Sequence, residues 1–119
     1  MPKVVVIGGS GFLGSHVCDS LTSSGYDVTI FDKAESPWMN PNQNLIIGDI
    51  LSFDDLSKAI EGSDYVYNFA GIADINESLQ SPLKTANLNI IGNLNILEAS
   101  RIHKVKRFIY ASSVYVHSA

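Results

Sequence analysis

The stretch KVVVIGGSGFLG, residues 3–14, decides the fold because it joins a buried strand to a glycine-rich turn. An unbroken apolar, β-branched run such as residues 3–7 is typical of a strand that is covered on both faces, as in parallel sheets. From Phe12 onward apolar residues recur four positions apart, which indicates a helix that Gly25 closes. The stretch therefore predicts a strand, a tight turn and the first helix of a parallel α/β fold.

Three glycines, Gly8, Gly11 and Gly14, are spaced three and three within this turn. Gly8 permits a sharp turn out of the strand, and Gly11 lets the backbone approach a phosphate. Gly14 allows the helix to pack closely on the strand. The helix start offers unpaired N–H groups and a positive dipole end, which predicts a dinucleotide pyrophosphate site. A glycine-rich turn without a ligand is the disfavoured alternative, because the strand and helix context is complete.

Asp32 follows Gly14 by eighteen positions and comes at the end of the expected second strand. A carboxylate there can accept hydrogen bonds from a ribose diol and would repel a 2′-phosphate. The alternative interpretation is an aspartate that only solubilises the end of the strand. Lys33 follows directly, but no arginine is placed to bind a 2′-phosphate. These residues favour NAD over NADP as the cofactor.

The rest of the chain continues the alternation of strands and helices. Ser52 is expected to cap a short helix, and Ser81 with Pro82 marks the start of a long one. Further strands are expected at residues 27–31, 45–47, 64–69 and 107–111. We predict an α/β fold, a doubly wound Rossmann-type parallel sheet of about five strands in the order 3-2-1-4-5. It forms a single NAD-binding domain over residues 1–119.

Composition and charge exclude several classes of protein. The 119 residues are 45% hydrophobic and carry a net charge of −4, which indicates a globular domain without nucleic acid as a partner. The apolar runs are too short to span a membrane, and no signal-peptide pattern is present. The single cysteine, Cys18, is expected to pack inside a helix, and a cytoplasmic location is the expectation. The histidines lie in different elements, so we expect no metal site.

Three further segments carry a family resemblance together with the glycine turn. Gly48-Asp49-Ile50 follows the third strand, Asn68-Phe69-Ala70-Gly71 ends the fourth, and NIIGNLNILEA, residues 89–99, lies in the long helix. The chain resembles the extended short-chain dehydrogenases, the NAD-dependent epimerase/dehydratase group that acts on nucleotide sugars. In that family the segment at the end of the fourth strand is usually His-Leu-Ala-Ala, and the long-helix motif is Asn-Val-x-Gly-Thr-x-Asn-Leu-Leu-Glu-Ala. Asn68 and Gly71 are therefore departures from the usual pattern.

The resemblance implies a role for each segment. Asp49 would hold the adenine amino group, with Ile50 touching the ring, and the segment after the fourth strand would line the adenosine and pyrophosphate. Asn89 would hydrogen-bond backbone near the active site, while the other asparagines of this helix are interpreted as a solvated face. The expected cofactor-binding set is Gly8, Gly11, Phe12, Leu13, Gly14, Asp32, Lys33, Asp49, Ile50, Phe69, Ala70, Gly71 and Asn89.

The fifth strand, RFIYASS at residues 107–113, resembles the strand that leads into the family's catalytic Ser or Thr. Ser113 takes the position of that catalytic hydroxyl. Ser112 is the rival, and a polar strand end is the alternative interpretation of both serines. The chain continues with Val-His-Ser at residues 116–118, where the family commonly has Val-Tyr-Gly.

The family's catalytic base, a tyrosine followed by a lysine at the fourth position, has no counterpart in this sequence. In the family, the lysine and the nicotinamide charge lower the pKa of that tyrosine, so that it can take a hydroxyl proton as hydride leaves. We therefore expect a truncated portion, inactive alone, of an enzyme that acts on nucleotide sugars. In the family this long helix normally packs against a partner subunit, so the resemblance implies a homodimer through residues 82–103.

Two other functions stay open. The first is a non-catalytic dinucleotide-binding regulatory module, which a longer protein without the Tyr-Lys pair would favour. The second is a simple NAD(P)-dependent carbonyl reductase of the same superfamily, because the residues that select the substrate would lie mostly outside this chain.

Overall fold

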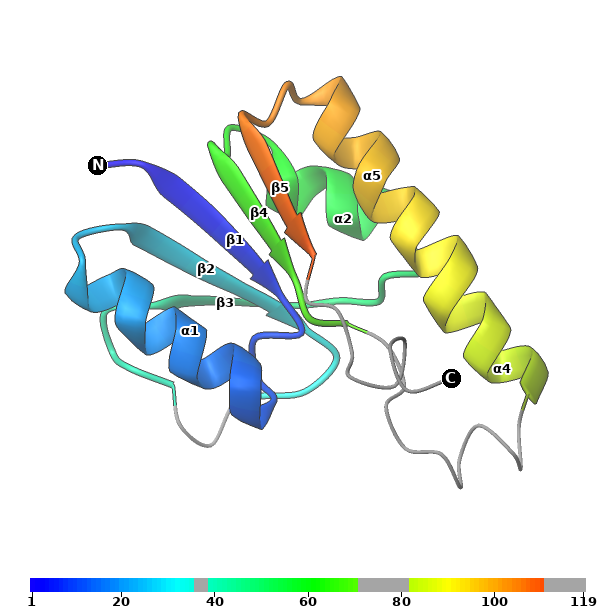
Figure 1. The fold of residues 1–119 in the computed structure, drawn as a ribbon, viewed down its shortest axis with the longest axis horizontal. Coiled ribbons are helices and arrows are strands. Elements are labelled where there is room, and N and C mark those ends of the chain that lie inside the picture. Colours follow the sequence, from blue (N-terminus) through cyan, green and yellow to red (C-terminus); the bar gives the residue numbers. More distant parts are fainter. Residues whose placement is uncertain (36–38, 71–81, 111–119) are drawn as a thin grey trace, which may run out of the picture.

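Five parallel strands form the sheet in the part of the chain that the structure, a computed structural model, describes: residues 1–35, 39–70 and 82–110. They are β1 (Lys3–Ile7), β2 (Asp27–Asp32), β3 (Asn44–Ile47), β4 (Tyr65–Asn68) and β5 (Arg107–Tyr110). The order β3-β2-β1-β4-β5 places β1 in the centre, paired with β2 and β4. The predicted doubly wound, Rossmann-type fold is confirmed (Figure 1).

Helices cover both faces of this sheet (Figure 1). α1 (Phe12–Ser23) lies on one face, and α2 (Phe53–Ile60) lies with α5 (Gly92–Ile102) on the other. The predicted helix ends are also present: the Ser52 side chain accepts from the Asp55 N–H at 3.4 Å, and Gly25 follows α1 with a φ of +92°. These local signals fix where the helices begin and end, and so where the strands meet the turns.

The central strand divides the core into two layers, because successive side chains of a strand point to opposite faces. Val4 and Val6 join Cys18 in a cluster beneath α1. Val5 and Ile7 join a second cluster that contains buried residues of α2 and α5, namely Leu56, Ala59, Ile60, Ile96 and Ala99. Burial on both faces explains the unbroken apolar run of β1.

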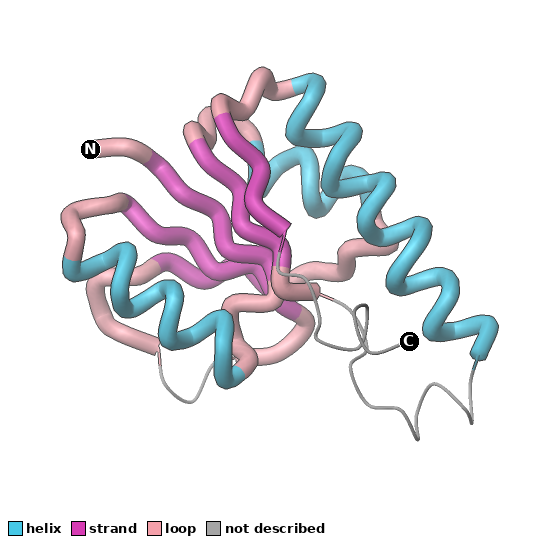
Figure 2. Tube along the Cα trace, in the orientation of Figure 1, coloured by secondary structure: helices cyan, strands magenta, loops and turns pink. Residues whose placement is uncertain are grey.

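The long helix differs from the prediction in its interior. It consists of α4 (Pro82–Ala86), a π-helical turn η1 (Asn87–Ile91) and α5, although Figure 2 shows it as one continuous helical rod. The buried positions of α5 are mostly small, Gly92, Ala99 and Ser100 together with Ile96. Small residues let the helix approach the sheet, and an apolar stripe of the helix faces outward: Leu83, Ala86, Ile90, Leu94 and Leu97.

No helix within residues 1–35, 39–70 and 82–110 is long and apolar enough to cross a membrane.

Candidate cofactor site

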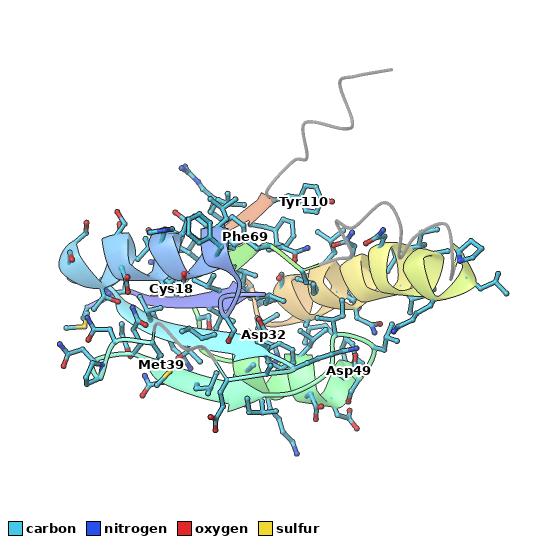
Figure 3. The ribbon with its side chains drawn as sticks, turned by 90° about the horizontal axis from the view of Figure 1, so that it is seen from below. Cys18, Asp32, Met39, Asp49, Phe69 and Tyr110 are labelled. Carbon is cyan, nitrogen blue, oxygen red and sulfur yellow. The ribbon has the colours of Figure 1, made fainter. Side chains whose placement is uncertain are left out.

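The carboxyl edge of the sheet brings the candidate cofactor residues together. Parallel strands end at one edge, and such folds bind ligands there, where the chain connections from neighbouring strands diverge. β1 lies between β2 and β4, which marks this point. The glycine turn follows β1, Asp32 ends β2 and Phe69 follows β4. Figure 3, seen from below the view of Figure 1, labels Asp32, Phe69 and also Asp49.

The turn after β1 contains a position that requires glycine. Gly8 has a φ of +79°, and a Cβ there would lie 2.8 Å from the Phe69 carbonyl carbon and 2.9 Å from the Ala70 nitrogen. The Gly8 N–H donates to the Phe31 carbonyl at 2.8 Å, and the Phe69 N–H donates to the Ile7 carbonyl at 2.7 Å. The turns after β1 and β4 are thus in direct backbone contact, and β2 holds the first of them.

Gly14 brings the start of α1 against the same turn. A Cβ on Gly14 would lie 2.5 Å from the Gly8 carbonyl oxygen and 2.9 Å from the Gly9 Cα. The predicted close approach is therefore present: the atoms nearest a Cβ on Gly14 belong to the turn, and the rest of the helix packs on Val4 and Val6 of β1. Gly11 faces open space, since a Cβ there would have only the Gly8 oxygen, at 3.6 Å, within 4 Å.

The first turn of α1 has the features of an anion site. Its N-cap, Gly11, has no side chain to bond the helix N–H groups, and the first turn contains no acidic residue. Phe12 and Leu13 are 70% and 58% exposed, so the helix start lies at the surface. An accessible helix N-terminus offers N–H donors and a positive dipole end to a phosphate. Together with the space at Gly11, this geometry fits a dinucleotide pyrophosphate.

Asp32 connects the glycine turn to the end of β2. One of its oxygens accepts from the Ser10 N–H at 3.0 Å, and the other accepts from the Lys33 N–H at 2.7 Å. The Ser10 hydroxyl donates to the Ala34 carbonyl at 2.8 Å, which ties the turn to the segment after β2. Each carboxylate oxygen has a second lone pair, so Asp32 can still accept from a ribose diol. The sequence interpretation missed this supporting role of Ser10.

Asp49 and Ile50 take different positions after β3. One Asp49 oxygen accepts from the Leu51 N–H at 2.9 Å, and the other lies 3.8 Å from the Lys33 Nζ. Ile50 is only 7% exposed, and its side chain fills the space that a side chain on Gly92 of α5 would need. Asp49 and Lys33 therefore lie at the surface next to the end of β2, while Ile50 is part of the core.

The end of β4 is held by asparagine side chains. Asn68 is 1% exposed; its Oδ1 accepts from the Ala70 N–H at 2.9 Å, and its Nδ2 donates to the Asn93 Oδ1. The Asn93 Nδ2 donates to the Asn89 carbonyl, and the Asn95 Nδ2 donates to the Ile50 carbonyl at 3.0 Å. The interpretation of the other helix asparagines as a solvated face was thus wrong for Asn93 and Asn95. The signal available was their position within an otherwise apolar helix.

Two predicted site residues, Gly71 and Ser113, lie outside the described residues.

Cys18 is buried as predicted, and burial, with a smaller contribution from Asp19, raises the pKa of its thiol to about 12. His16 packs edge-to-face on Phe12, with ring centroids 4.6 Å apart. Among the described residues no three His, Cys, Asp or Glu side chains are grouped so that they could hold a metal ion.

Solved structures of known proteins share this fold. The UDP-glucose 4-epimerase of Thermotoga maritima, solved with UDP-glucose, is 33% identical over 93% of this chain, with a TM-score of 0.88. The Brucella ovis UDP-glucose 4-epimerase in complex with NAD is 29% identical over the whole chain, with a TM-score of 0.91. This chain covers 38% of each of those proteins.

Sequence comparison agrees with the structural likeness. The bifunctional UDP-glucose 4-epimerase and UDP-xylose 4-epimerase 1 of Pisum sativum is 32% identical over 97% of this chain, which spans 37% of that relative. Residues 4–119 match the NAD dependent epimerase/dehydratase family. NAD, the cofactor predicted from the sequence, is the cofactor of this family. The chain therefore belongs to the NAD-dependent epimerase/dehydratase family.

Proposed function

We propose that this chain binds NAD at the carboxyl edge of its sheet, with the pyrophosphate on the first turn of α1. The observation that carries the proposal is the glycine turn, in which Gly8 and Gly14 leave no room for side chains and Gly11 leaves an uncapped helix start accessible. Phe12 and Leu13 would flank the pyrophosphate on the exposed side. Backbone N–H groups and the helix dipole would supply most of the attraction for the phosphates.

The adenosine half would lie over the ends of β2 and β3. Asp32 would accept hydrogen bonds from the ribose diol, while Asp49 would bind the adenine amino group with Lys33 beside it; the Ile50 side chain, which packs in the core, would not hold the ring. Phe69, Ala70 and Gly71 would line the opposite side of the cofactor. Since the Asp32 carboxylate is hydrogen-bonded to the glycine turn at the end of β2, its charge would disfavour a 2′-phosphate.

The longer protein to which this chain would belong is proposed to be an epimerase or dehydratase of nucleotide sugars, since the chain spans 37% of the Pisum sativum relative and 38% of the Thermotoga maritima epimerase. Bound NAD would supply an acceptor for hydride from a sugar carbon. Ser113 would donate a hydrogen bond to the substrate hydroxyl, and Asn89 would organise the backbone near it. We expect no turnover by the chain alone, because it contains no tyrosine followed by lysine at the fourth position. A cytoplasmic location belongs to the same proposal.

A homodimer through the helix of residues 82–103 is also proposed. Leu83, Ile90, Leu94 and Leu97 are between 46% and 82% exposed, which leaves a row of large apolar side chains on its outer face. Such surfaces commonly mark protein interfaces. Sedimentation equilibrium should give the mass of two chains, and Leu94→Glu should shift the mass toward that of one. A monomeric mass for the unmodified chain would contradict the dimer.

Calorimetric titration tests the cofactor assignment directly. NAD should bind more tightly than NADP, and Gly14→Val should abolish both binding events, because its side chain would clash with the Gly8 carbonyl oxygen and displace the glycine turn. A control is Gly62→Ala: no atom lies within 4 Å of an added Cβ there, and its φ of +77° makes the change strained, so it should lose stability and keep NAD binding. Absence of binding of either nucleotide, or tighter binding of NADP, would contradict the assignment. Turnover of UDP-sugars by the whole protein would test the proposed enzyme activity.

A further inference from the structure

A buried amide stands at the end of β4, next to the proposed cofactor site. The Asn68 side chain is 1% exposed, so each of its polar atoms needs a partner inside the protein. Its Oδ1 accepts from the Ala70 N–H at 2.9 Å, and its Nδ2 donates to the Asn93 Oδ1. These two bonds orient the amide, and the amide in turn orients the backbone between Phe69 and Ala70.

Asn93 extends this chain of bonds into the long helix. Its Nδ2 donates to the carbonyl of Asn89, which lies in the π-helical turn η1. In a regular α-helix that carbonyl would accept from the backbone N–H four residues later, but a π-helical turn lengthens this spacing to five. The Asn93 side chain therefore supplies a donor to a carbonyl at the place where the regular helical pattern is interrupted.

A second contact fixes the same helix to the turn after β3. The Asn95 Nδ2 donates to the Ile50 carbonyl at 3.0 Å, and Gly92 leaves room for the Ile50 side chain. One turn of α5 is thus attached both to the end of β4 and to the segment that follows Asp49. A shift of this helix would have to move two strand ends at the carboxyl edge together.

We propose that Asn68 and Asn93 act as a pair of positioning residues, which hold the Ala70 backbone and the Asn89 carbonyl in a fixed relation at the cofactor site. This inference rests on the proposed NAD binding. Neither side chain needs to touch the cofactor. The pair acts because the Phe69–Ala70 backbone that contacts the glycine turn and the π-helical turn share one continuous set of hydrogen bonds.

Two variants of the same shape separate positioning from packing. Asn93→Thr keeps a hydroxyl that can accept from Asn68 and donate to the carbonyl four residues earlier, that of Asn89. Asn93→Val replaces that hydroxyl by a methyl group and removes both bonds. NAD affinity is measured by calorimetry and the exchange rate of the Ala70 amide by NMR, at a temperature where urea unfolding shows each variant to be folded.

The valine variant should bind NAD about tenfold more weakly, equivalent to about 1.4 kcal/mol, and exchange its Ala70 amide faster. The threonine variant should stay within about twofold of the unmodified chain in both measurements. Equal NAD affinity of the valine and threonine variants would overturn the inference. Absence of NAD binding by the unmodified chain would instead overturn the proposed function. If the valine variant does not fold, Asn93→Ala replaces it in the same comparison.

Discussion

The turn after β1 and the turn after β4 lie against each other, yet they are held in place in opposite ways. In the first turn, Gly8 and Gly14 work by the absence of side chains, because their neighbours occupy the space of a Cβ. In the second turn, Asn68 acts through its side chain, which is hydrogen-bonded to Ala70 and to Asn93, a residue of α5 that is far along the sequence. The turn after β1 depends on the absence of side chains at Gly8 and Gly14, and the turn after β4 depends on the hydrogen-bond partners of Asn68.

The largest expected effect comes from adding a methyl group to the first turn. Gly8→Ala should abolish NAD binding, because its Cβ would lie 2.8 Å from the Phe69 carbonyl carbon and its φ of +79° is unfavourable for alanine. The backbone strain alone should cost about 1–3 kcal/mol of unfolding free energy. Calorimetry with NAD and urea unfolding measure the two effects.

Gly25→Ala is the matched control for that change. Gly25 has a comparable φ of +92°, but no atom lies within 4 Å of an added Cβ. This variant should lose stability through strain and keep its NAD affinity. Equal loss of NAD binding in both variants would show that the close contact between the two turns has no special importance.

A substitution in the second turn should have a smaller effect than Gly8→Ala in the first turn. Asn68→Leu keeps a similar shape but leaves the Ala70 N–H and the Asn93 Oδ1 without their partner, at a cost of about 1–3 kcal/mol of unfolding free energy. Asn44→Ala removes a hydrogen bond of 3.3 Å from an exposed residue and should change stability by less than about 0.5 kcal/mol. Urea unfolding compares them, and similar losses would mean that burial of the amide is unimportant.

The same contrast explains what could be predicted from the sequence. Gly8, Gly11 and Gly14 are recognisable because their spacing after an apolar run has a local physical cause. The helix ends at Ser52 and Gly25 follow from equally local signals, and the strand order follows from the alternation of strands and helices along the chain. The fold and the glycine turn could therefore be predicted from the order of the residues alone.

The asparagine contacts could not be predicted in this way. Whether Asn93 faces solvent or Asn68 depends on the rotation of a helix whose interior contains the π-helical turn η1. A sequence pattern with a regular helical period cannot predict such a turn. For the same reason the sequence does not indicate the outward direction of Leu94 and its stripe, which follows from the packing of small residues such as Gly92 against the sheet.

A smaller effect is expected on the choice between NAD and NADP. Asp32→Asn removes the negative charge at the end of β2 and should shift the ratio of the two dissociation constants toward NADP by about tenfold, or about 1.4 kcal/mol. Asp49→Asn frees Lys33 from an ion pair of 3.8 Å and should shift the same ratio by only about twofold, because both partners are exposed to solvent. A larger effect of Asp49 would assign the selectivity to the lysine.

The smallest effect concerns the opposite edge of the sheet, at Asp64. The Lys3 N–H, which donates to this carboxylate at 2.9 Å, and the nearby Lys106 lower the pKa of Asp64 below its ordinary value of 3.8. The associated stability is complete above that value and is lost as the pH falls through the lowered pKa. Asp64→Asn should therefore flatten the acid side of the stability curve in urea unfolding. NAD affinity at neutral pH should not change, since this edge lies away from the glycine turn.

Cys18 lies beneath the glycine turn, and its reactivity can report on the movement of that turn. Its sulfur would lie 3.1 Å from a Cβ on Gly9, and burial raises the pKa of the thiol to about 12. A thiol reagent can reach this sulfur only when α1 or the turn above it moves away. Because Cys18 is the single cysteine of the chain, the rate of thiol modification measures how often the phosphate-binding turn opens. Bound NAD should lower that rate in the unmodified chain.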